Sequence, residues 1–292
     1  LVFLGAMANL GARAIGVATD SQGMVPAALR ETFQQLERAG EKDRVKAIYL
    51  VPYADNPGGI TMPLARSEEI LEISRGIAGR ELPIQLIVDL AYRDLRYTGE
   101  DIPSMRSLDE AGDQVIVTGT FSKSFSPGIR VGWGLLPEYL VAPVCDQKGN
   151  IDFGSPNFNQ HLVMEIMEQD LLDPHVRDLC QHYQVKQAAM LAAAERWFSD
   201  LDGVRWQHPS GGLYVWMQVP EGIDTRPGGA LFEAASREGV LYVAGGYCYP
   251  PEGAPVHENT MRLSFGVQSP EKIDQGMEAL SRALRLVMET RG

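Results

Sequence analysis

The chain has 292 residues, of which 45% are hydrophobic and 22% charged, and its formal net charge is −12. This composition indicates a folded globular protein of one or two domains and argues against disorder. The acidic balance disfavours a nucleic-acid partner, because binding to phosphates requires a positive surface. The sequence contains no apolar run near the roughly 20 residues that span a bilayer, so no membrane partner is expected.

Cysteines and histidines give no sign of a metal centre. The three cysteines are widely spaced, and the five histidines lack the spacing of metal ligands. An odd, small number of cysteines without paired spacing is typical of a reduced compartment, so we expect a cytoplasmic protein without a metal.

The first residues, Leu1-Val2-Phe3-Leu4, form an apolar run without the basic segment or cleavage pattern of a signal peptide. The run predicts a β-strand that the chain enters partway through. Because the chain starts at a leucine rather than a methionine, we expect it to be a fragment that lacks its natural N-terminus.

Strand-like and helix-like segments alternate in the first part of the chain. Short apolar runs at Ala47–Val51, Ile84–Val88 and Val115–Val117 predict strands, and the spacing of apolar residues over Pro63–Arg80 predicts a helix. Strands that are apolar on both faces and separated by helices are typical of a parallel sheet covered on both sides. The sequence therefore predicts an α/β domain with a mainly parallel sheet between helices.

Polar residues follow two of these predicted strands. Asp89 comes directly after the strand at 84–88, and Thr120 and Ser122 follow the strand that begins at Val115. In open α/β sheets, ligands bind outside the carboxyl ends of the strands. This edge of the predicted sheet is therefore the expected place of a ligand site.

The second part of the chain is mainly helical before it returns to mixed structure. A helical pattern runs from Asn157 to Trp197 with an expected interruption near Asp173-Pro174. Beyond it we predict strands at Leu213–Val219 and Met261–Phe265 and a helix at Gly229–Glu238. We predict a large cofactor-binding domain over residues 1–175 and a small α+β domain over residues 176–292.

The last helix has a clear start signal. Ser269-Pro270-Glu271 matches an N-cap, a first-turn proline and an acidic first turn. Its apolar stripe is formed by Ile273, Met277, Leu280, Leu284 and Val287.

The segment from Thr120 to Trp133, TFSKSFSPGIRVGW, carries the most chemistry. It combines several hydroxyls with Lys123 and Arg130 directly after a predicted buried strand. The planar fork of an arginine suits a phosphate, and a lysine beside such a site suits a Schiff base with a carbonyl cofactor. Taken alone, the same residues also fit a polar loop with a solvated lysine.

Three motifs in order resemble the class I/II aminotransferase family, whose members use pyridoxal 5′-phosphate (PLP). The segment around Lys123 resembles the cofactor-lysine signature, Asp55-Asn56-Pro57-Gly58-Gly59 resembles the Asn-Pro-x-Gly turn, and Asp89-Leu90-Ala91-Tyr92 resembles the Asp-x-x-Tyr motif. The likeness runs from about Gly5 to the end and is greatest to the 2-aminoadipate, kynurenine and aromatic aminotransferases. It implies the PLP-dependent transferase fold type I, a homodimer, and transfer of an amino group from a 2-amino acid to a 2-oxo acid.

The resemblance also implies catalytic roles at the matching positions. Lys123 would form the internal aldimine with PLP and then move the substrate α-proton. Asp89 would pair with the pyridine nitrogen and keep it protonated, which makes the ring an electron sink. Tyr92 and Asn56 would donate hydrogen bonds to the 3-oxygen of the ring.

Further positions would bind the phosphate and the substrate. By the same resemblance, Thr120, Ser122 and Arg130 would hold the phosphate. Arg262, in a segment similar to the family's carboxylate-binding strand, would grip the substrate α-carboxylate, with Asn56 also at the substrate.

The resemblance has two departures. Gly58 stands where the family more often has threonine, which loosens the turn but leaves Asn56 in place. The family's Gly-rich phosphate loop and an aromatic residue that stacks on the ring belong to a region that would precede Leu1. Because a helix N-terminus is a strong anion site, we expect this chain alone to bind PLP poorly.

Two alternatives stay open. Lyases and decarboxylases of the same fold share the lysine, aspartate and tyrosine. An aminotransferase-like domain also occurs in winged-helix transcription regulators, where PLP would serve for sensing, and the DNA-binding domain would lie upstream of Leu1.

Overall fold

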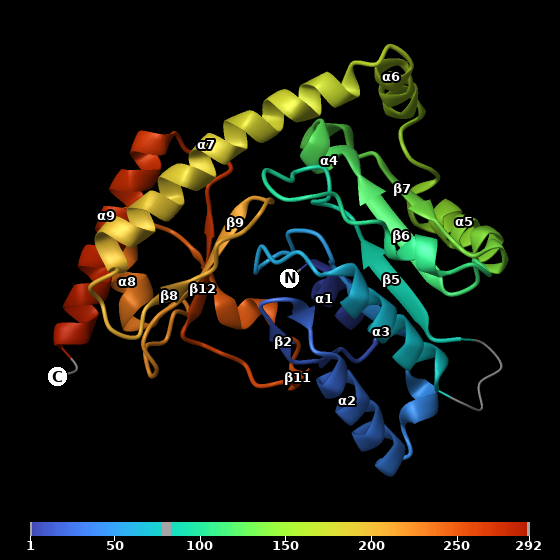
Figure 1. Ribbon diagram of the computed structural model, residues 1–292, viewed down its shortest axis with the longest axis horizontal. Helices are drawn as coiled ribbons and strands as arrows, with labels where there is room; N and C mark the ends of the chain where they lie inside the picture. The colour runs from blue at the N-terminus through green and yellow to red at the C-terminus, as the bar shows by residue number, and fades with distance from the viewer. Residues whose placement is uncertain (1, 78–82, 291–292) are drawn as a thin grey trace. The chain divides into compact units, whose positions relative to one another are not determined.

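The computed structural model describes residues 2–77 and 83–290 (Figure 1). The chain divides into two compact units. We call Thr19–Asp55 with Ile60–Cys180 the central unit, and Leu1–Ala18, Asn56–Gly59 and Gln181–Gly292 together the terminal unit. The domain division predicted after residue 175 stays a prediction.

The central unit is built around a four-stranded sheet. Its strands are β4 (Ala47–Leu50), β5 (Gln85–Asp89), β6 (Val115–Thr120) and β7 (Gly132–Leu135), in the order β4-β5-β6-β7. β4, β5 and β6 run parallel and β7 is antiparallel to β6, so the mainly parallel sheet is confirmed (Figure 1). Alternate residues of the parallel strands are buried, among them Leu50, Leu86, Val88, Val115 and Val117.

Two helices of the central unit pack against each other: α2 (Pro26–Arg38) and α3 (Leu64–Arg75). The predicted helix over 63–80 is confirmed in its first part, with Ile70, Leu71 and Ile73 buried. It ends earlier than predicted, at Gly76, because glycine favours helix termination. Residues 78–80 of the prediction lie outside the described residues.

The later helices are α5 (Glu138–Asp152), α6 (Asn157–Glu168) and α7 (Leu172–Phe198). The interruption predicted near Asp173-Pro174 is confirmed a few residues earlier, at residues 169–171, where Asp170 has a positive φ of 54°. Pro174 instead lies in the first turn of α7. Proline is tolerated there because first-turn N–H groups have no acceptor within the helix.

The terminal unit has a second, antiparallel sheet. Its strands are β8 (Arg205–Trp206), β9 (Tyr214–Gln218), β10 (Val243–Ala244) and β12 (Thr260–Ser264), in the order β10-β12-β9-β8. The helices α8 (Ala230–Arg237) and α9 (Pro270–Glu289) pack on each other. These elements confirm the strands and helices predicted for this part of the chain.

The start of α9 follows its sequence signal. The Ser269 hydroxyl accepts a hydrogen bond from the Lys272 N–H at 3.4 Å, and the predicted apolar stripe is buried along its length. Burial of this stripe supplies most of the stabilisation of such a helix.

The first residues contradict the sequence prediction. The strand expected at Leu1–Leu4 is absent from the described part of this segment, which instead forms the helix α1 (Val2–Asn9). A short apolar run fits a buried strand and a helix equally well by its periodicity, and the alanines and methionine that follow favour the helix.

Short elements complete the chain. The strand pairs are β1 (Ile15–Gly16) with β11 (Glu252–Gly253) and β2 (Thr19–Asp20) with β3 (Gly23–Met24). One-turn helices are α4 (Phe121–Ser124), η1 (Lys42–Arg44), η2 (Met105–Leu108), η3 (Pro127–Ile129) and η4 (Gly245–Cys248).

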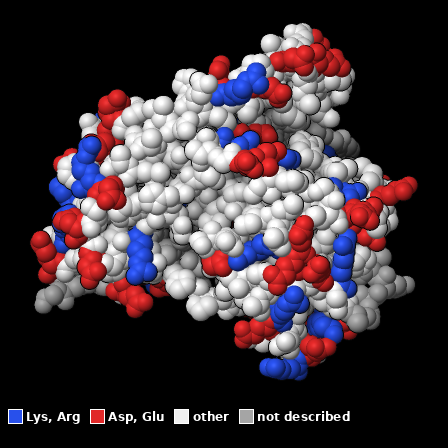
Figure 2. All heavy atoms as spheres, in the orientation of Figure 1, with Lys and Arg blue, Asp and Glu red and all other residues white. Residues whose placement is uncertain are grey.

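Charged side chains on the surface of α2 and its surroundings alternate in sign, as Figure 2 shows. Ion pairs there include Arg30 with Glu69, at 3.4 Å, and Arg44 with Glu41, at 2.8 Å. Such exposed pairs contribute little to stability individually. Across the described ranges, no helix is both long enough and apolar enough to cross a membrane.

Candidate active site

The ends of two neighbouring parallel strands bring predicted site residues to one edge of the central sheet. Asp89 is the last residue of β5 and lies opposite Thr118 of β6, and Thr120 is the last residue of β6. The strands β5 and β6 lie side by side in Figure 1. Tyr92 lies in the turn directly after β5 and is buried. The sheet edge predicted from the sequence is therefore the place where these residues meet.

Lys123 lies on a short helix that starts at this edge. Thr120 caps α4, because its Oγ1 accepts a hydrogen bond from the Ser122 N–H at 3.1 Å. The half-buried Lys123 side chain places Nζ 6.0 Å from the centroid of the Tyr92 ring. Lys123 and Tyr92, which are 31 positions apart in the sequence, thus belong to one cluster with Asp89.

Arg130 returns to the same cluster through an unusual backbone conformation. Its φ and ψ are 53° and 38°, in the left-handed region that non-glycine residues rarely adopt. Its Nη1 donates to the Ser122 hydroxyl at 3.4 Å and to the Pro127 carbonyl at 3.2 Å. Strained residues of this kind persist where the surrounding structure holds them, often at ligand sites.

The donors of this loop fit a phosphate group. The hydroxyls of Thr120 and Ser122 and the exposed guanidinium of Arg130 come from one short segment, and each can donate to a phosphate oxygen. Beside them, the buried Ser124 hydroxyl has no hydrogen-bond partner among the described residues. The donor set therefore suits the phosphate of PLP, and Lys123 stands next to it.

Tyr49 is a member of this cluster that the sequence did not reveal. It lies on β4, next to β5, and its hydroxyl donates a hydrogen bond to Oδ2 of Asp89 at 2.6 Å. The other carboxylate oxygen, Oδ1, accepts the Ala91 N–H at 2.9 Å. Burial first, and then the hydrogen bond and charge of Asp89, raise the pKa of Tyr49 above its ordinary value. The phenol therefore stays neutral and able to donate.

A second cluster lies in the terminal unit and joins two residues far apart in sequence. Nη1 of Arg262, on β12, donates a hydrogen bond to Oδ1 of Asn56 at 2.7 Å. The guanidinium carbon lies 4.1 Å from the centroid of the Tyr214 ring. In the part of the chain that the structure describes, the buried Nε of Arg262 has no hydrogen-bond partner.

The predicted site residues thus form two sets, each within its own unit. The central unit holds Asp89, Tyr92, Thr120, Ser122, Lys123 and Arg130, and the terminal unit holds Asn56 and Arg262. Tyr49 and Tyr214 join these sets as residues that the sequence analysis missed.

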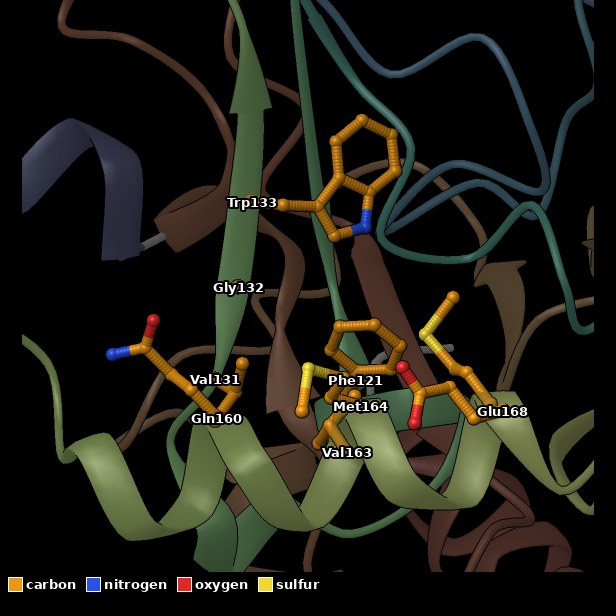
Figure 3. Close-up of a pocket in the computed structure, with 9 residues that line it drawn as sticks. Phe121, Val131, Gly132, Trp133, Gln160, Val163, Met164 and Glu168 are labelled. Carbon is orange, nitrogen blue, oxygen red and sulfur yellow. The ribbon is translucent and has the colours of Figure 1, made fainter.

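A cavity of about 600 Å³ lies beside the lysine loop of the central unit (Figure 3). It is lined by Phe121, Val131, Gly132, Trp133, Gln160, Val163, Met164, Met167 and Glu168. Figure 3 shows Trp133 extending from β7, with Val163 and Met164 on α6. This lining is mostly apolar and includes none of the predicted cofactor residues, so the cavity is a neighbour of the candidate site.

Comparison with known proteins agrees with this geometry. Residues 17–280 match the model of the family "Aminotransferase class I and II". Aromatic-amino-acid aminotransferase 1 of Thermococcus litoralis is 34% identical over 94% of this chain and 62% of its own length. HTH-type transcriptional regulator NorG of Staphylococcus aureus is 31% identical over 80% of this chain and 49% of its own length.

Solved structures show the same fold. Kynurenine aminotransferase of Pyrococcus horikoshii, in complex with PMP, has a TM-score of 0.88 at 30% identity, covering 98% of this chain and 67% of that chain. The chain spans less than two thirds of the curated aromatic aminotransferase that it matches. It has the predicted PLP-dependent transferase fold type I, and it belongs to the class I and II aminotransferase family.

Proposed function

We propose that this chain is the lysine-bearing part of a PLP-dependent aminotransferase that moves an amino group from a 2-amino acid to a 2-oxo acid. The observation that carries the proposal is the cluster at the end of the central sheet. There Lys123 lies over the Tyr92 ring, and Asp89 ends the neighbouring strand. The family match and the named aminotransferases among its relatives support the same activity.

The residues of the central unit divide the task of holding PLP. The Thr120 and Ser122 hydroxyls and the Arg130 guanidinium would bind the phosphate oxygens. The Asp89 carboxylate would accept a hydrogen bond from the protonated pyridine nitrogen, and the Tyr92 hydroxyl would donate to the 3-oxygen. Bound PLP would supply an aldehyde carbon that takes up the amino group and a ring that accepts electrons from the α-carbon.

Lys123 would have two tasks. Its Nζ would hold the cofactor covalently, and when the substrate displaces it, the free amine would take the proton from the substrate α-carbon and deliver it to the carbon that takes up the amino group. The half-buried position of the side chain suits both tasks, because it restricts access of water while the short helix α4 fixes the direction of the lysine.

The residues of the terminal unit would recognise the substrate. We propose that Arg262 binds the α-carboxylate, because a guanidinium can donate two parallel hydrogen bonds to a carboxylate. Its Nη1 bond to Asn56 and its stacking on Tyr214 restrict its rotation. Fixing an arginine before binding reduces the entropy that binding costs. Asn56 would also contact the 3-oxygen of the ring, as the resemblance implies.

The test is to trap the lysine chemically. The chain is incubated with PLP, reduced with borohydride, digested and mapped by mass spectrometry. We expect the pyridoxyl mass on Lys123, retention of this label in Lys186→Ala and its loss in Lys123→Ala. Lys186 is a matched control, because its Nζ donates to the Gly266 carbonyl in the terminal unit. Label spread evenly over the lysines would refute the proposal.

A second measurement distinguishes an aminotransferase from a transcription regulator that uses PLP only for sensing. After PLP is bound, a panel of amino acids is added and the absorbance of the bound cofactor is followed. Conversion to the pyridoxamine form by one class of amino acids supports the aminotransferase and names its substrate. Labelling of Lys123 without any conversion would instead favour a regulator of the kind found among the relatives.

A further inference from the structure

Both oxygens of the Asp89 carboxylate are held by groups on the chain. Oδ1 accepts the backbone N–H of Ala91 at 2.9 Å, and Oδ2 accepts the Tyr49 hydroxyl at 2.6 Å. A carboxylate has about four acceptor positions, so these two bonds leave it able to accept another. They also restrict rotation of the carboxylate about its last side-chain bond, which is otherwise a soft torsion.

One of the two donors to Asp89 is a backbone group and the other is a side chain of the neighbouring strand. The Ala91 N–H belongs to the turn that follows β5, so any residue at position 91 except proline would provide it. The Tyr49 hydroxyl comes from the neighbouring strand β4, where Tyr49 is paired with Ile87, two residues before Asp89. The Tyr49 side chain connects the carboxylate to the next strand of the sheet through a hydrogen bond to a carboxylate oxygen, which is among the stronger hydrogen bonds of proteins.

The phenol also remains a donor near neutral pH. Burial and the neighbouring Asp89 charge raise the pKa of Tyr49, so it does not ionise near neutral pH. A neutral phenol can donate its hydrogen bond to Asp89 Oδ2 and leaves the other acceptor positions of the carboxylate open to a protonated pyridine nitrogen.

We infer that Tyr49 is a positioning residue for the cofactor ring: its hydroxyl holds the Asp89 carboxylate in the orientation that accepts the hydrogen bond of the pyridine nitrogen. This inference rests on the proposed function. Tyr49 lies on β4, outside all three sequence motifs, so the inference adds a residue of β4 to the site. Tyr49 does not touch the cofactor in this scheme and acts only through Asp89.

A purely structural role is the competing explanation, because a buried tyrosine hydroxyl needs an acceptor wherever it lies. Tyr53 provides the matched control. It is a buried tyrosine of the same unit, and its hydroxyl donates to the carbonyl oxygens of Ile102 at 2.8 Å and Pro103 at 3.1 Å. Tyr53→Phe removes a comparable hydroxyl without touching Asp89.

The experiment measures the dissociation constant of two probes by fluorescence titration of the whole chain. The first probe is PLP, and the second is its carbocyclic analogue, in which a C–H group replaces the ring nitrogen. For PLP, we expect Tyr49→Phe to weaken binding by about tenfold and Tyr53→Phe to leave it unchanged. For the analogue, both variants should bind as the wild type does, because Asp89 has no ring nitrogen to accept from.

The outcomes separate the inference from the function on which it rests. Equal loss of PLP and analogue binding in Tyr49→Phe would show a structural role only and overturn the inference, as would unchanged PLP binding.

If Tyr49→Phe fails to fold, 3-fluorotyrosine at position 49 replaces it, since fluorine makes the phenol a stronger donor at nearly the same shape. Tighter binding of PLP with unchanged binding of the analogue then supports the inference, and equal change of both overturns it. Absence of specific labelling of Lys123 in the wild type at saturating PLP would overturn the proposed function itself.

Discussion

The buried carboxylate of Asp109 should be a major determinant of the stability of the central sheet. Its side chain is fully buried, and its Oδ2 accepts the N–H groups of Gln114 at 3.0 Å and Val115 at 2.8 Å, at the start of β6. Arg75 lies 3.4 Å away and Arg106 3.9 Å away. This carboxylate therefore anchors the start of β6, the strand that leads into the helix α4 with Lys123.

The size of the effect follows from these bonds. Each hydrogen bond to a charged group contributes roughly 1.5–3 kcal/mol, and loss of the acceptor leaves two N–H groups buried without a partner. We expect Asp109→Ala to lower the free energy of unfolding by about 3–5 kcal/mol. Asp109→Asn keeps an acceptor oxygen and loses only the charge, so about 1–2 kcal/mol is expected.

The effect should depend on pH in a defined direction. Burial alone would raise the pKa of Asp109, but the N–H groups of Val115 and Gln114 and the charges of Arg106 and Arg75 hold it below its ordinary value. A lowered pKa in the folded state gives stability that is present above the ordinary pKa and lost as the pH falls through the folded value. The difference between the wild type and Asp109→Asn should therefore be constant at neutral pH and shrink in acid.

The assay is urea denaturation followed by circular dichroism, at several pH values, with the exposed Asp202→Asn as control. If Asp109→Ala costs no more than Asp202→Asn, the carboxylate is not the anchor described above. A difference that grows as the pH falls would refute the assignment of the pKa shift.

Two further predictions concern local backbone geometry and can be checked by thermal melting. Gly59→Ala should destabilise the protein by about 2 kcal/mol or more, because its φ is +69° and the new Cβ would lie 2.5 Å from the Pro209 Cβ. Gly40→Ala, with a φ of +70° and open space around it, should cost only about 1 kcal/mol, and equal costs would contradict the role of the steric clash. Ser269→Ala should cost about 1 kcal/mol by removing the cap on the Lys272 N–H, whereas Ser269→Asp should restore stability. Failure of the aspartate to restore it would contradict the capping assignment.

Much of the fold was predictable because its signals are local. The strands that end at Asp89 and near Thr120 are short apolar runs, and a parallel sheet brings their ends to one edge whatever the details of packing. The start of α9 was equally clear from Ser269 and Pro270. The apolar run at Leu1–Leu4 had no such start signal, and its prediction as a strand was wrong.

The contacts between distant residues were not predictable from one sequence. In the sequence, Tyr49 cannot be told from any other tyrosine of a strand, because its bond to Asp89 depends on the order and register of β4 and β5. The bond between Asn56 and Arg262 joins positions 206 residues apart, and no local pattern signals it. The motifs pointed to the candidate site residues, whereas the contacts that Tyr49 and Tyr214 make with them required the structure.

The division of the chain has a consequence for protein engineering. The four-residue segment Asn56–Gly59 belongs to the terminal unit although the sequence on both sides of it belongs to the central unit. A gene cut after Cys180 would therefore separate Arg262 from Asn56. The first product would contain the whole central unit with two segments of the terminal unit, and the second product would contain an incomplete terminal unit. Split-protein reporters, circular permutants and domain exchanges made from this chain must therefore keep both Leu1–Ala18 and Asn56–Gly59 together with the C-terminal segment.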